Sequence, residues 1–295
     1  MTVIVPATSA NMGPGFDSLG VALKFYNKVE ISPSTFFSVS VRGEGARFLK
    51  TKNGNAFLNV FYKTYTRLTG AEDTFRFRFE NNIPLSRGLG SSSAAIVSAL
   101  TAARLAAKAP IDKREILSEA LTYESHPDNI APATFGGFCV CALSDKNVVF
   151  SRVCLDDDLR AVITIPNKSI STRFSRSALP KKMKLEDAAF NIAHSSLLTA
   201  ALITKDYDLL RVACADRLHQ TVRMRMLPQL FDVQKIAFES GALSATLSGS
   251  GSSFFSLAEN DAAAQKIAAK LRDKFPAFRT EIFEFDALGA RAQES

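Results

Sequence analysis

A run of glycine and serine residues between positions 84 and 95 is the part of the sequence best suited to bind a phosphate. It reads PLSRGLGSSSAA, follows a strand-like run (Thr74–Glu80) and precedes an alanine-rich helical pattern (Ser92–Lys108). Gly88 and Gly90 allow the backbone to turn tightly and to bring its amides close to a ligand. The serines would occupy the first helical turn, where unpaired N–H groups and the helix dipole favour an anion. Their hydroxyls also suit a Mg²⁺ ion carried by the phosphates.

Two other motifs come close to this loop without matching it. It is not a Walker loop, because Gly-Lys-Ser/Thr does not occur in the chain, and the protein-kinase signatures are missing as well. The segment Gly90–Ala94 approaches the nucleophile elbow of a hydrolase, for which His126 and Asp128 would complete a triad. An elbow has one serine between two glycines, and the second glycine is missing here. The phosphate interpretation is therefore favoured.

Three further segments are rich in turn-forming or polar residues. Pro6–Gly20 follows the first strand-like run and offers Asn11 and Asp17, although both residue types are also common in turns. Glu124–Asn129, with the sequence ESHPDN, carries two acids and a histidine and suits a metal or substrate site. Thr246–Ser253 is either a tight hairpin or a piece of backbone packed against the phosphate loop. The other two histidines lie on helical patterns and are interpreted as structural.

Short strands alternate with helices along the whole chain. Strand-like runs rich in Val, Ile, Phe or Thr occur at Thr2–Val5, Phe36–Arg42, Thr74–Glu80, Phe138–Leu143, Val148–Val153, Ala161–Ile165, Ala242–Leu247, Ser252–Leu257 and Thr280–Phe285. Helical patterns cover Ser92–Lys108, Leu185–Lys205, Tyr207–Arg225 and Ala262–Phe275. The character of the sequence changes after about residue 166. We therefore expect an α+β chain with two lobes that divide between residues 150 and 170.

The composition is that of an ordinary globular protein. Of 295 residues, 46% are hydrophobic and 22% charged, which excludes a disordered or fibrous chain. No apolar run approaches the roughly 18 residues of a membrane-spanning helix, and the N-terminus lacks the pattern of a secretory signal. The four cysteines have neither metal-ligand nor disulfide-framework spacing. These features predict a cytoplasmic protein that does not bind membranes.

The net charge of +7 raises the question of nucleic-acid binding. The basic residues are spread along the chain rather than clustered. In Phe75–Phe79 phenylalanine alternates with arginine, which favours a strand with one buried face over an aromatic platform for RNA. We therefore expect no nucleic-acid partner, and an anionic ligand such as ATP explains the basic balance more simply.

The four segments together, in this order and spacing, resemble the GHMP kinase superfamily and, within it, the homoserine kinase family. Pro84–Ala94 is similar to the superfamily's phosphate loop and Thr246–Ser253 to its C-terminal glycine motif. Pro6–Gly20 resembles the N-terminal signature of the homoserine kinase family, and His126–Asn129 its substrate loop. The resemblance extends over nearly the whole chain, and the N-terminal signature is its most specific part.

This resemblance implies a fold, a partner and a reaction. The fold is a ribosomal-protein-S5-domain-2-like, ATP-binding N-terminal domain (residues 1–160) followed by a ferredoxin-like C-terminal domain (residues 161–295), often assembled as a homodimer. The reaction is the ATP-dependent phosphorylation of the L-homoserine hydroxyl to O-phospho-L-homoserine, a step of threonine biosynthesis that uses Mg²⁺.

The resemblance also implies roles for individual residues. ATP would contact Asn55, Gly249, Gly251 and the loop residues Pro84, Leu85, Ser86, Arg87, Gly88, Leu89, Gly90, Ser91, Ser92, Ser93 and Ala94. Homoserine would contact Asn11, Asp17, His126, Asp128, Asn129, Thr172, Arg176 and Arg223. Mg²⁺ would be held by Ser92 and Glu124. The catalytic set would be Asn11, Asp17, Ser92 and Glu124.

The substrate assignment agrees with simple charge chemistry. Homoserine is a zwitterion, so its site needs a carboxylate for the amine and a guanidinium for the carboxylate, which Asp17, Arg176 and Arg223 supply. Arg173 and Arg225 are neighbours that could take over the arginine roles. Mevalonate has no amine, which makes Asp17 less useful to a mevalonate-type kinase.

Some alternatives stay open at this point. Glu119 competes with Glu124 as the metal ligand, and the sequence identifies no proton acceptor. Ser250 and Ser252 stand where the family usually has alanine and proline, which predicts a looser turn. Another GHMP-type kinase and a non-catalytic ligand sensor on the same fold remain as rival functions. The sensor is disfavoured because the serines of the phosphate loop and Glu124 are intact.

Overall fold

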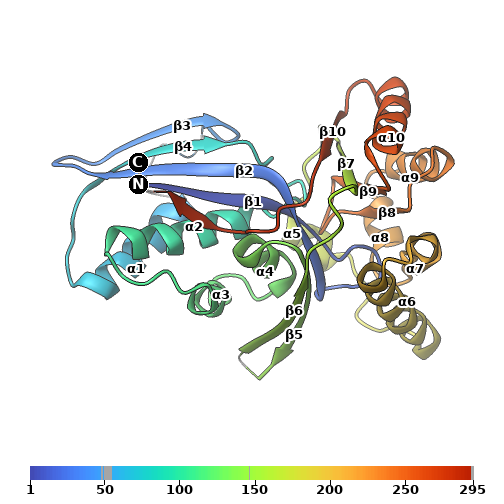
Figure 1. The fold of residues 1–295 in the computed structure, drawn as a ribbon, viewed down its shortest axis with the longest axis horizontal. Coiled ribbons are helices and arrows are strands. Elements are labelled where there is room, and N and C mark those ends of the chain that lie inside the picture. The colour runs from blue at the N-terminus through green and yellow to red at the C-terminus, as the bar shows by residue number, and fades with distance from the viewer. Residues whose placement is uncertain (48, 50–54, 146, 294–295) are drawn as a thin grey trace.

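Two β-sheets organise the chain, and helices cover one side of each (Figure 1). The computed structural model describes residues 1–47, 49, 55–145 and 147–293. The strands are β1 Thr2–Ala10, β2 Leu19–Pro33, β3 Ser38–Gly43, β4 Phe75–Asn81, β5 Phe138–Ser144, β6 Asn147–Val153, β7 Arg160–Ile165, β8 Ser244–Leu247, β9 Phe254–Ala258, β10 Arg279–Phe283 and β11 Arg291–Gln293. The helices are α1 Ala56–Thr69, α2 Ser91–Ala106, α3 Lys113–Ala120, α4 Pro127–Phe135, α5 Thr172–Ser177, α6 Leu185–Thr204, the 3₁₀ turn η1 Tyr207–Leu209, α7 Leu210–Ala213, α8 Gln220–Met224, α9 Gln229–Glu239 and α10 Asp261–Lys274.

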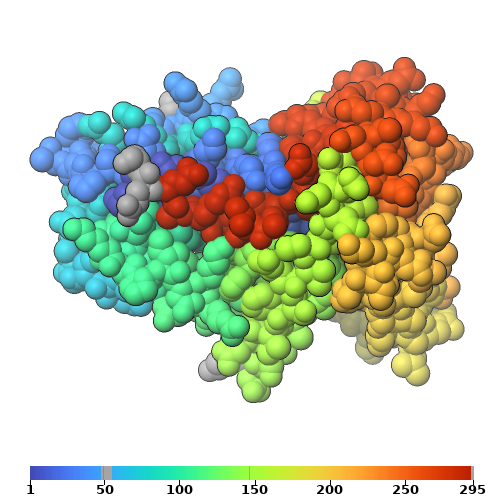
Figure 2. All heavy atoms as spheres, in the orientation of Figure 1, coloured from blue at the N-terminus to red at the C-terminus, as the bar shows by residue number. Residues whose placement is uncertain are grey.

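The first sheet has the order β11-β1-β2-β4-β3, and the β5–β6 hairpin joins it through β2. Figure 1 shows α1, α2, α3 and α4 on one side of this sheet. The phenylalanines of β4 are buried against α1, whereas Arg78 and Glu80, which alternate with buried residues, are exposed, as the alternating sequence predicts. The last strand, β11, pairs with β1, so both ends of the chain lie in this sheet. The C-terminal segment is therefore visible across the surface of the N-terminal half (Figure 2).

Helix α2 lies at the centre of the first lobe and positions the phosphate loop. It packs against β1, α1, α3 and α4, and most of its residues are buried. Its high alanine content follows from this position, because small side chains let the helix approach several neighbours closely. The helix begins at Ser91, directly after the second glycine of the loop.

The second sheet has the strand order β10-β7-β9-β8. In chain order these strands are the fourth, first, third and second, which is the βαββαβ arrangement of ferredoxin-like folds. Helices α9 and α10 pack on this sheet around a separate apolar cluster. Within the described residues no helix combines the length and apolar character needed to cross a membrane.

The structure corrects three sequence-based expectations. The longest strand, β2, was not expected, because Gly20, Asn27 and Pro33 are poor strand formers. The helical pattern predicted for Tyr207–Arg225 is wrong in its middle, where η1, α7 and α8 are separated by an irregular segment. That segment bends because the Asp216 carboxylate accepts hydrogen bonds from the three backbone amides that follow Arg217. Helices α1, α4, α5 and α9 were also missed.

The close packing of β2 against α4 gives the first test. A Cβ atom at Gly20 would lie 1.7 Å from the carbonyl oxygen of Asp128. Gly20→Ala should therefore lower the free energy of unfolding in urea by about 3 kcal/mol or more. At the control Gly70, which has φ +72° and open space around it, alanine should cost only about 1–2 kcal/mol. Equal losses for both variants would contradict this packing.

Candidate active site

Two adjoining cavities lie beside the phosphate loop, and the smaller one also includes residues of the second lobe. The larger, about 300 Å³, is lined by residues of β2, α1, β4 and α2. The smaller, about 140 Å³, is lined by the loop, the N-terminal segment, α4 and α5. Ser86, Ser91 and Ser92 line both, so the phosphate loop forms the boundary between them. Every residue from Pro84 to Ala94 lines at least one of the two cavities.

The start of α2 faces the smaller cavity without a side-chain cap. Gly90 occupies the N-cap position with φ +68° in the left-handed region and, having no side chain, it forms no capping hydrogen bond with the first turn. The first amides of a helix have no partner within the helix. These groups and the hydroxyls of Ser91–Ser93 together make the donor-rich end that an anionic phosphate needs.

The glycine-rich turn of the second lobe, which contains Ser248, packs against the phosphate loop. The Ser248 hydroxyl donates to the Gly88 carbonyl at 2.6 Å, and a Cβ at Gly88 would lie 2.1 Å from the Ser248 carbonyl oxygen. The Arg87 side chain donates to the carbonyls of Pro166 and Asn167, so it anchors the loop to the segment after β7. Gly249 lines the cavity, whereas Gly251 packs against Gly88 outside the lining.

Glu124 is a half-buried carboxylate beside the loop serines. Its Oε2 accepts a hydrogen bond of 2.9 Å from Ser93. Burial raises the pKa of Glu124, and the hydrogen bonds from Ser93 and Ser92 oppose that rise. Within the described ranges no lysine or arginine pairs with Glu124. The alternative acid, Glu119, instead pairs with Arg67 at 2.7 Å and lines neither cavity.

Asp17 and Arg176 form a bidentate ion pair at the mouth of the smaller cavity. The two guanidinium nitrogens donate to the two carboxylate oxygens at 3.0 and 2.7 Å. Both side chains are about one third exposed. The Asp17 backbone has φ +58°, and its amide donates to the Asn11 side chain, so the loop conformation fixes the carboxylate. Arg176 comes from α5, which places opposite charges from the two lobes side by side.

Arg223 is the second arginine that lines the cavity. Its side chain is only 2% exposed, whereas its neighbour Arg225 and the alternative Arg173 are exposed and line neither cavity. One guanidinium nitrogen, Nη1, donates to the Gly249 carbonyl at 3.1 Å. Burial and the nearby Arg176 charge lower the pKa of Arg223 to about 10, which still leaves it charged at neutral pH.

Asp128 is a buried acid that lines the same cavity from the start of α4. Its exposed fraction is 3%. Burial raises its pKa to about 7, and the charges of Asp17 and Glu124 add to the rise. Asn129 accepts a hydrogen bond of 2.7 Å from Thr8, a residue that sequence reasoning missed. His126 lies 3.9 Å from Asp17, and burial lowers the pKa of its ring.

Two serines that depart from the family pattern bond across the turn. Ser250 lies 3.2 Å from the Thr172 hydroxyl, and its carbonyl accepts from Ser175 at 2.9 Å. The Ser252 hydroxyl donates to the Lys168 carbonyl at 2.5 Å. These bonds tie the turn to the segment that leads into α5, so they argue against the looser turn that the replacements predicted.

Apart from Asn55 and the phosphate loop, the sequence did not predict the residues that line the larger cavity. Asn55 lines it, as expected for a contact with the base of ATP, but its side chain already caps α1 through Leu58 and donates to the Leu49 carbonyl. The apolar walls come from Phe57 and Phe79. These side chains follow ordinary core patterns in the sequence, and no local signal distinguishes them from other buried residues.

Comparisons with known proteins agree with this geometry. The model of the GHMP kinases N terminal domain matches residues 55–137, and that of the GHMP kinases C terminal matches residues 198–277. The chain is 53% identical to a homoserine kinase of Campylobacter lari over 98% of this chain and 99% of that protein. It is 49% identical to a homoserine kinase of a Nitratiruptor species over the full length of both. The chain belongs to the homoserine kinase family.

A solved structure of the same family supports the fold. The crystal structure of homoserine kinase from Cytophaga hutchinsonii has a TM-score of 0.88 to this chain at 28% identity, covering 99% of this chain and 96% of that one. The predicted GHMP kinase fold is therefore confirmed, and membership of the homoserine kinase family implies use of ATP. The residue boundary at 160/161 stays a prediction.

The raised pKa of Asp128 gives a test of pH dependence. Because its pKa is raised, the folded chain keeps its proton up to about pH 7, and stability falls as the pH rises through that value. Asp128→Asn should therefore raise Tm by about 5 °C at pH 8, or roughly 2 kcal/mol, and by less than half as much at pH 5.

The exposed residue Asp158 provides a matched control for this prediction. Asp158→Asn should change Tm by about 1 °C or less at either pH, as surface substitutions usually do. The measurement is differential scanning fluorimetry in matched buffers. A Tm gain for Asp128→Asn that is the same at both pH values would show that its carboxyl is not protonated in the folded chain near neutrality.

Proposed function

We propose that this chain transfers the γ-phosphoryl group of ATP to the hydroxyl of L-homoserine. The relatives that match it along their whole length are homoserine kinases, and the charges of the smaller cavity fit this acceptor. The Asp17–Arg176 ion pair is the observation that carries the proposal. The amine and carboxylate of an α-amino acid sit on one carbon atom, so a complementary site needs opposite charges in contact, as they are here.

The bound zwitterion would replace this ion pair with two matched contacts. Its ammonium would face Asp17 and Asp128, and its carboxylate would face Arg176 and Arg223. The ammonium would also stabilise the anionic form of Asp128, whose pKa is raised in the free site. Asn11, His126, Asn129 and Thr172 line the same cavity and complete the proposed acceptor site.

The larger cavity is the proposed site for the adenosine of ATP. It has apolar walls and opens onto the start of α2. The loop residues Pro84–Ala94 and the turn at Gly249 would hold the phosphates, with Gly251 supporting the loop from behind. In this arrangement the γ-phosphate would lie at the boundary between the cavities, next to the acceptor hydroxyl.

Glu124 and Ser92 fit a Mg²⁺ ion. Glu124 is a half-buried carboxylate whose hydrogen-bond partners, among the residues that the structure describes, are serine hydroxyls. A desolvated carboxylate without a cationic side chain beside it suits a metal ion. No group of three acidic, histidine or cysteine side chains suited to a metal occurs in the described part of the chain. That agrees with Mg²⁺, which completes its coordination with phosphate and water oxygens. When bound, the ion neutralises phosphate charge.

The protein's contribution to the reaction is alignment and charge stabilisation. The amides at the start of α2 hold the phosphates, while the acceptor site orients the homoserine hydroxyl for in-line attack. A bond forms between that oxygen and the γ-phosphorus, the bond to the β-phosphate oxygen breaks, ADP leaves, and the hydroxyl proton is released to solvent. A loose transition state needs little help from a base, and we assign none. The homodimer expected for the family stays a prediction.

The acceptor specificity has a direct test. ADP release should depend on L-homoserine, and mevalonate, galactose and shikimate should give less than about 1% of that rate, because they lack the ammonium that Asp17 and Asp128 require. The measurement is a coupled ADP-release assay with each acceptor at equal concentration. ADP release with an acceptor that lacks an amine, but not with homoserine, would overturn the proposal.

The metal assignment predicts a difference between two glutamates. Glu124→Gln should lower kcat by about 100-fold and raise the Mg²⁺ concentration that gives half-maximal rate. Glu119→Gln is the matched control, because Glu119 pairs with Arg67 away from both cavities. Its kcat and Mg²⁺ dependence should stay within about 3-fold of the parent. Chelation of Mg²⁺ should abolish turnover, and the opposite ranking of the two variants would assign the metal to Glu119.

A further inference from the structure

The guanidinium of Arg223 is buried without the carboxylate partner that a buried positive charge normally has. In the described part of the chain no carboxylate forms an ion pair with it, and its Nε has no hydrogen-bond partner. Its Nη1 contacts two groups, the Gly249 carbonyl at 3.1 Å and Nδ1 of His219 at 3.2 Å. Because these two partners are neutral, no ion pair fixes the orientation of the Arg223 guanidinium, and its neutral contacts must do so.

The ring of His219 is fully buried and bonded at both nitrogens. Nε2 lies 2.8 Å from the carbonyl oxygen of Gly13, and Nδ1 faces Arg223. A guanidinium can only donate, so Nδ1 must carry the lone pair, and the proton must sit on Nε2, which donates to Gly13. Burial lowers the pKa of His219 to about 4, which agrees with a neutral ring in one tautomer.

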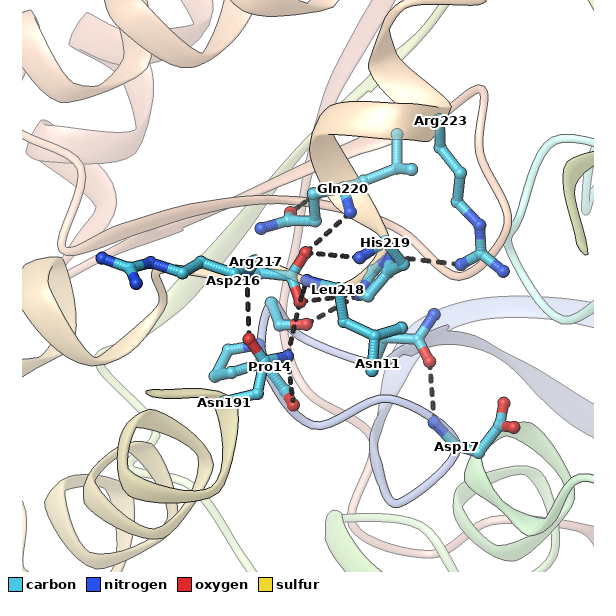
Figure 3. A network of polar contacts seen from close by, with 12 residues as sticks. Asn11, Pro14, Asp17, Asn191, Asp216, Arg217, Leu218, His219, Gln220 and Arg223 are labelled. Atoms are coloured by element: carbon cyan, nitrogen blue, oxygen red, sulfur yellow. Dashed lines mark hydrogen bonds and ion pairs between the residues drawn. The ribbon is translucent and has the colours of Figure 1, made fainter. Parts of the chain in front are cut away.

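A second network fixes the backbone of His219 (Figure 3). The buried Asp216 carboxylate accepts from the amides of Leu218, His219 and Gln220, at 3.2, 2.9 and 2.7 Å. It also accepts from the Asn191 side chain at 2.7 Å, which ties it to α6. With its backbone held in this way, the imidazole has little freedom to follow Arg223 if that side chain moves.

The same ring joins Arg223 to the N-terminal loop that carries the acceptor-binding residues. Gly13 lies between Asn11 and Asp17, and the Asn11 amide donates at 3.0 Å to the Gly249 carbonyl that Arg223 also contacts. The centres of the Phe16 and His219 rings lie 5.3 Å apart. The guanidiniums of Arg176 and Arg223 lie 5.1 and 5.3 Å from the centre of the Phe16 ring. One histidine therefore contacts both halves of the acceptor site.

We infer that His219 is a positioning residue for the acceptor, which holds the Arg223 guanidinium and the Asn11–Asp17 loop in register by donating from Nε2 and accepting at Nδ1. This inference rests on the proposed function, in which Arg223 binds the homoserine carboxylate. It predicts that a change at His219 weakens homoserine binding more than ATP binding or the chemical step.

Two substitutions separate the two hydrogen bonds. An asparagine oxygen can take the place of Nδ1, so His219→Asn keeps an acceptor for Arg223 and loses the contact to Gly13. A glutamine amide can take the place of Nε2, so His219→Gln keeps the contact to Gly13 and leaves Arg223 without its acceptor. We expect His219→Gln to raise the KM of homoserine about 10-fold and His219→Asn by about 3-fold or less. The KM of ATP and kcat should change by less than about 3-fold in both.

Control variants distinguish the possible failures. His194→Gln is the matched control, because that ring contacts Phe190 of its own helix and lines neither cavity; it should leave all three constants unchanged. Arg223→Lys should raise the KM of homoserine at least as much as His219→Gln. If Arg223→Lys leaves that KM unchanged, the proposed carboxylate contact is wrong. If only Arg223→Lys raises it, the role of His219 is wrong.

A measurement on the unmodified protein covers the case in which a variant does not fold. Two-bond ¹H–¹⁵N correlation spectra of the imidazoles should show His219 as the Nε2–H tautomer near neutral pH, and homoserine should shift its Nδ1 signal. Equal rises in the KM of homoserine and ATP in both His219 variants, with a matching loss of Tm, would reduce the residue to a structural role. An Nδ1–H tautomer would overturn the inference directly.

Discussion

The contact between the phosphate loop and the glycine-rich turn of the second lobe is the constraint on which the site depends. The backbones of Gly88 and Ser248 are in close contact, since a Cβ atom at Gly88 would lie 2.1 Å from the Ser248 carbonyl oxygen. The Gly88 carbonyl also accepts a hydrogen bond of 2.6 Å from the Ser248 hydroxyl. The same turn contributes the Gly249 carbonyl that Asn11 and Arg223 share. One rigid joint therefore sets both the phosphate-binding end of α2 and the position of the acceptor site.

A second constraint is electrostatic, because the acceptor site concentrates charges that a folded chain normally avoids burying. Asp128 and Glu124 have raised pKa values, and that of Arg223 is lowered, because burial disfavours the charged form of each. This burial cost lowers the stability of the free protein, and in the proposed complex each group would gain a further opposite charge from a ligand. Selection for binding explains why such residues persist despite their cost to stability.

Local sequence signals predicted the elements that local physics determines. The phosphate loop, the alanine-rich α2 and the alternating strand β4 follow from glycine placement and hydrophobic period, and the structure has them within one or two residues. Strand β2 was missed because its pairing with β1, β4 and β5 overrides weak strand formers such as Asn27. The Asp17–Arg176 pair joins residues 159 positions apart, and the contact of His219 with Gly13 joins residues 206 positions apart, so no local sequence pattern predicts either.

The ion pair in the free site also bears on how the acceptor is recognised. A ligand with only a carboxylate would have to draw Arg176 away from Asp17 and would leave that acid, only one third exposed, without a cation. A ligand with only an amine would leave Arg176 and Arg223 close together with no anion between them. In the proposed site a zwitterion would satisfy both at once, because it would exchange one ion pair for two. Discrimination would then come less from extra attraction than from the unpaired charge that an acceptor without both groups would leave behind.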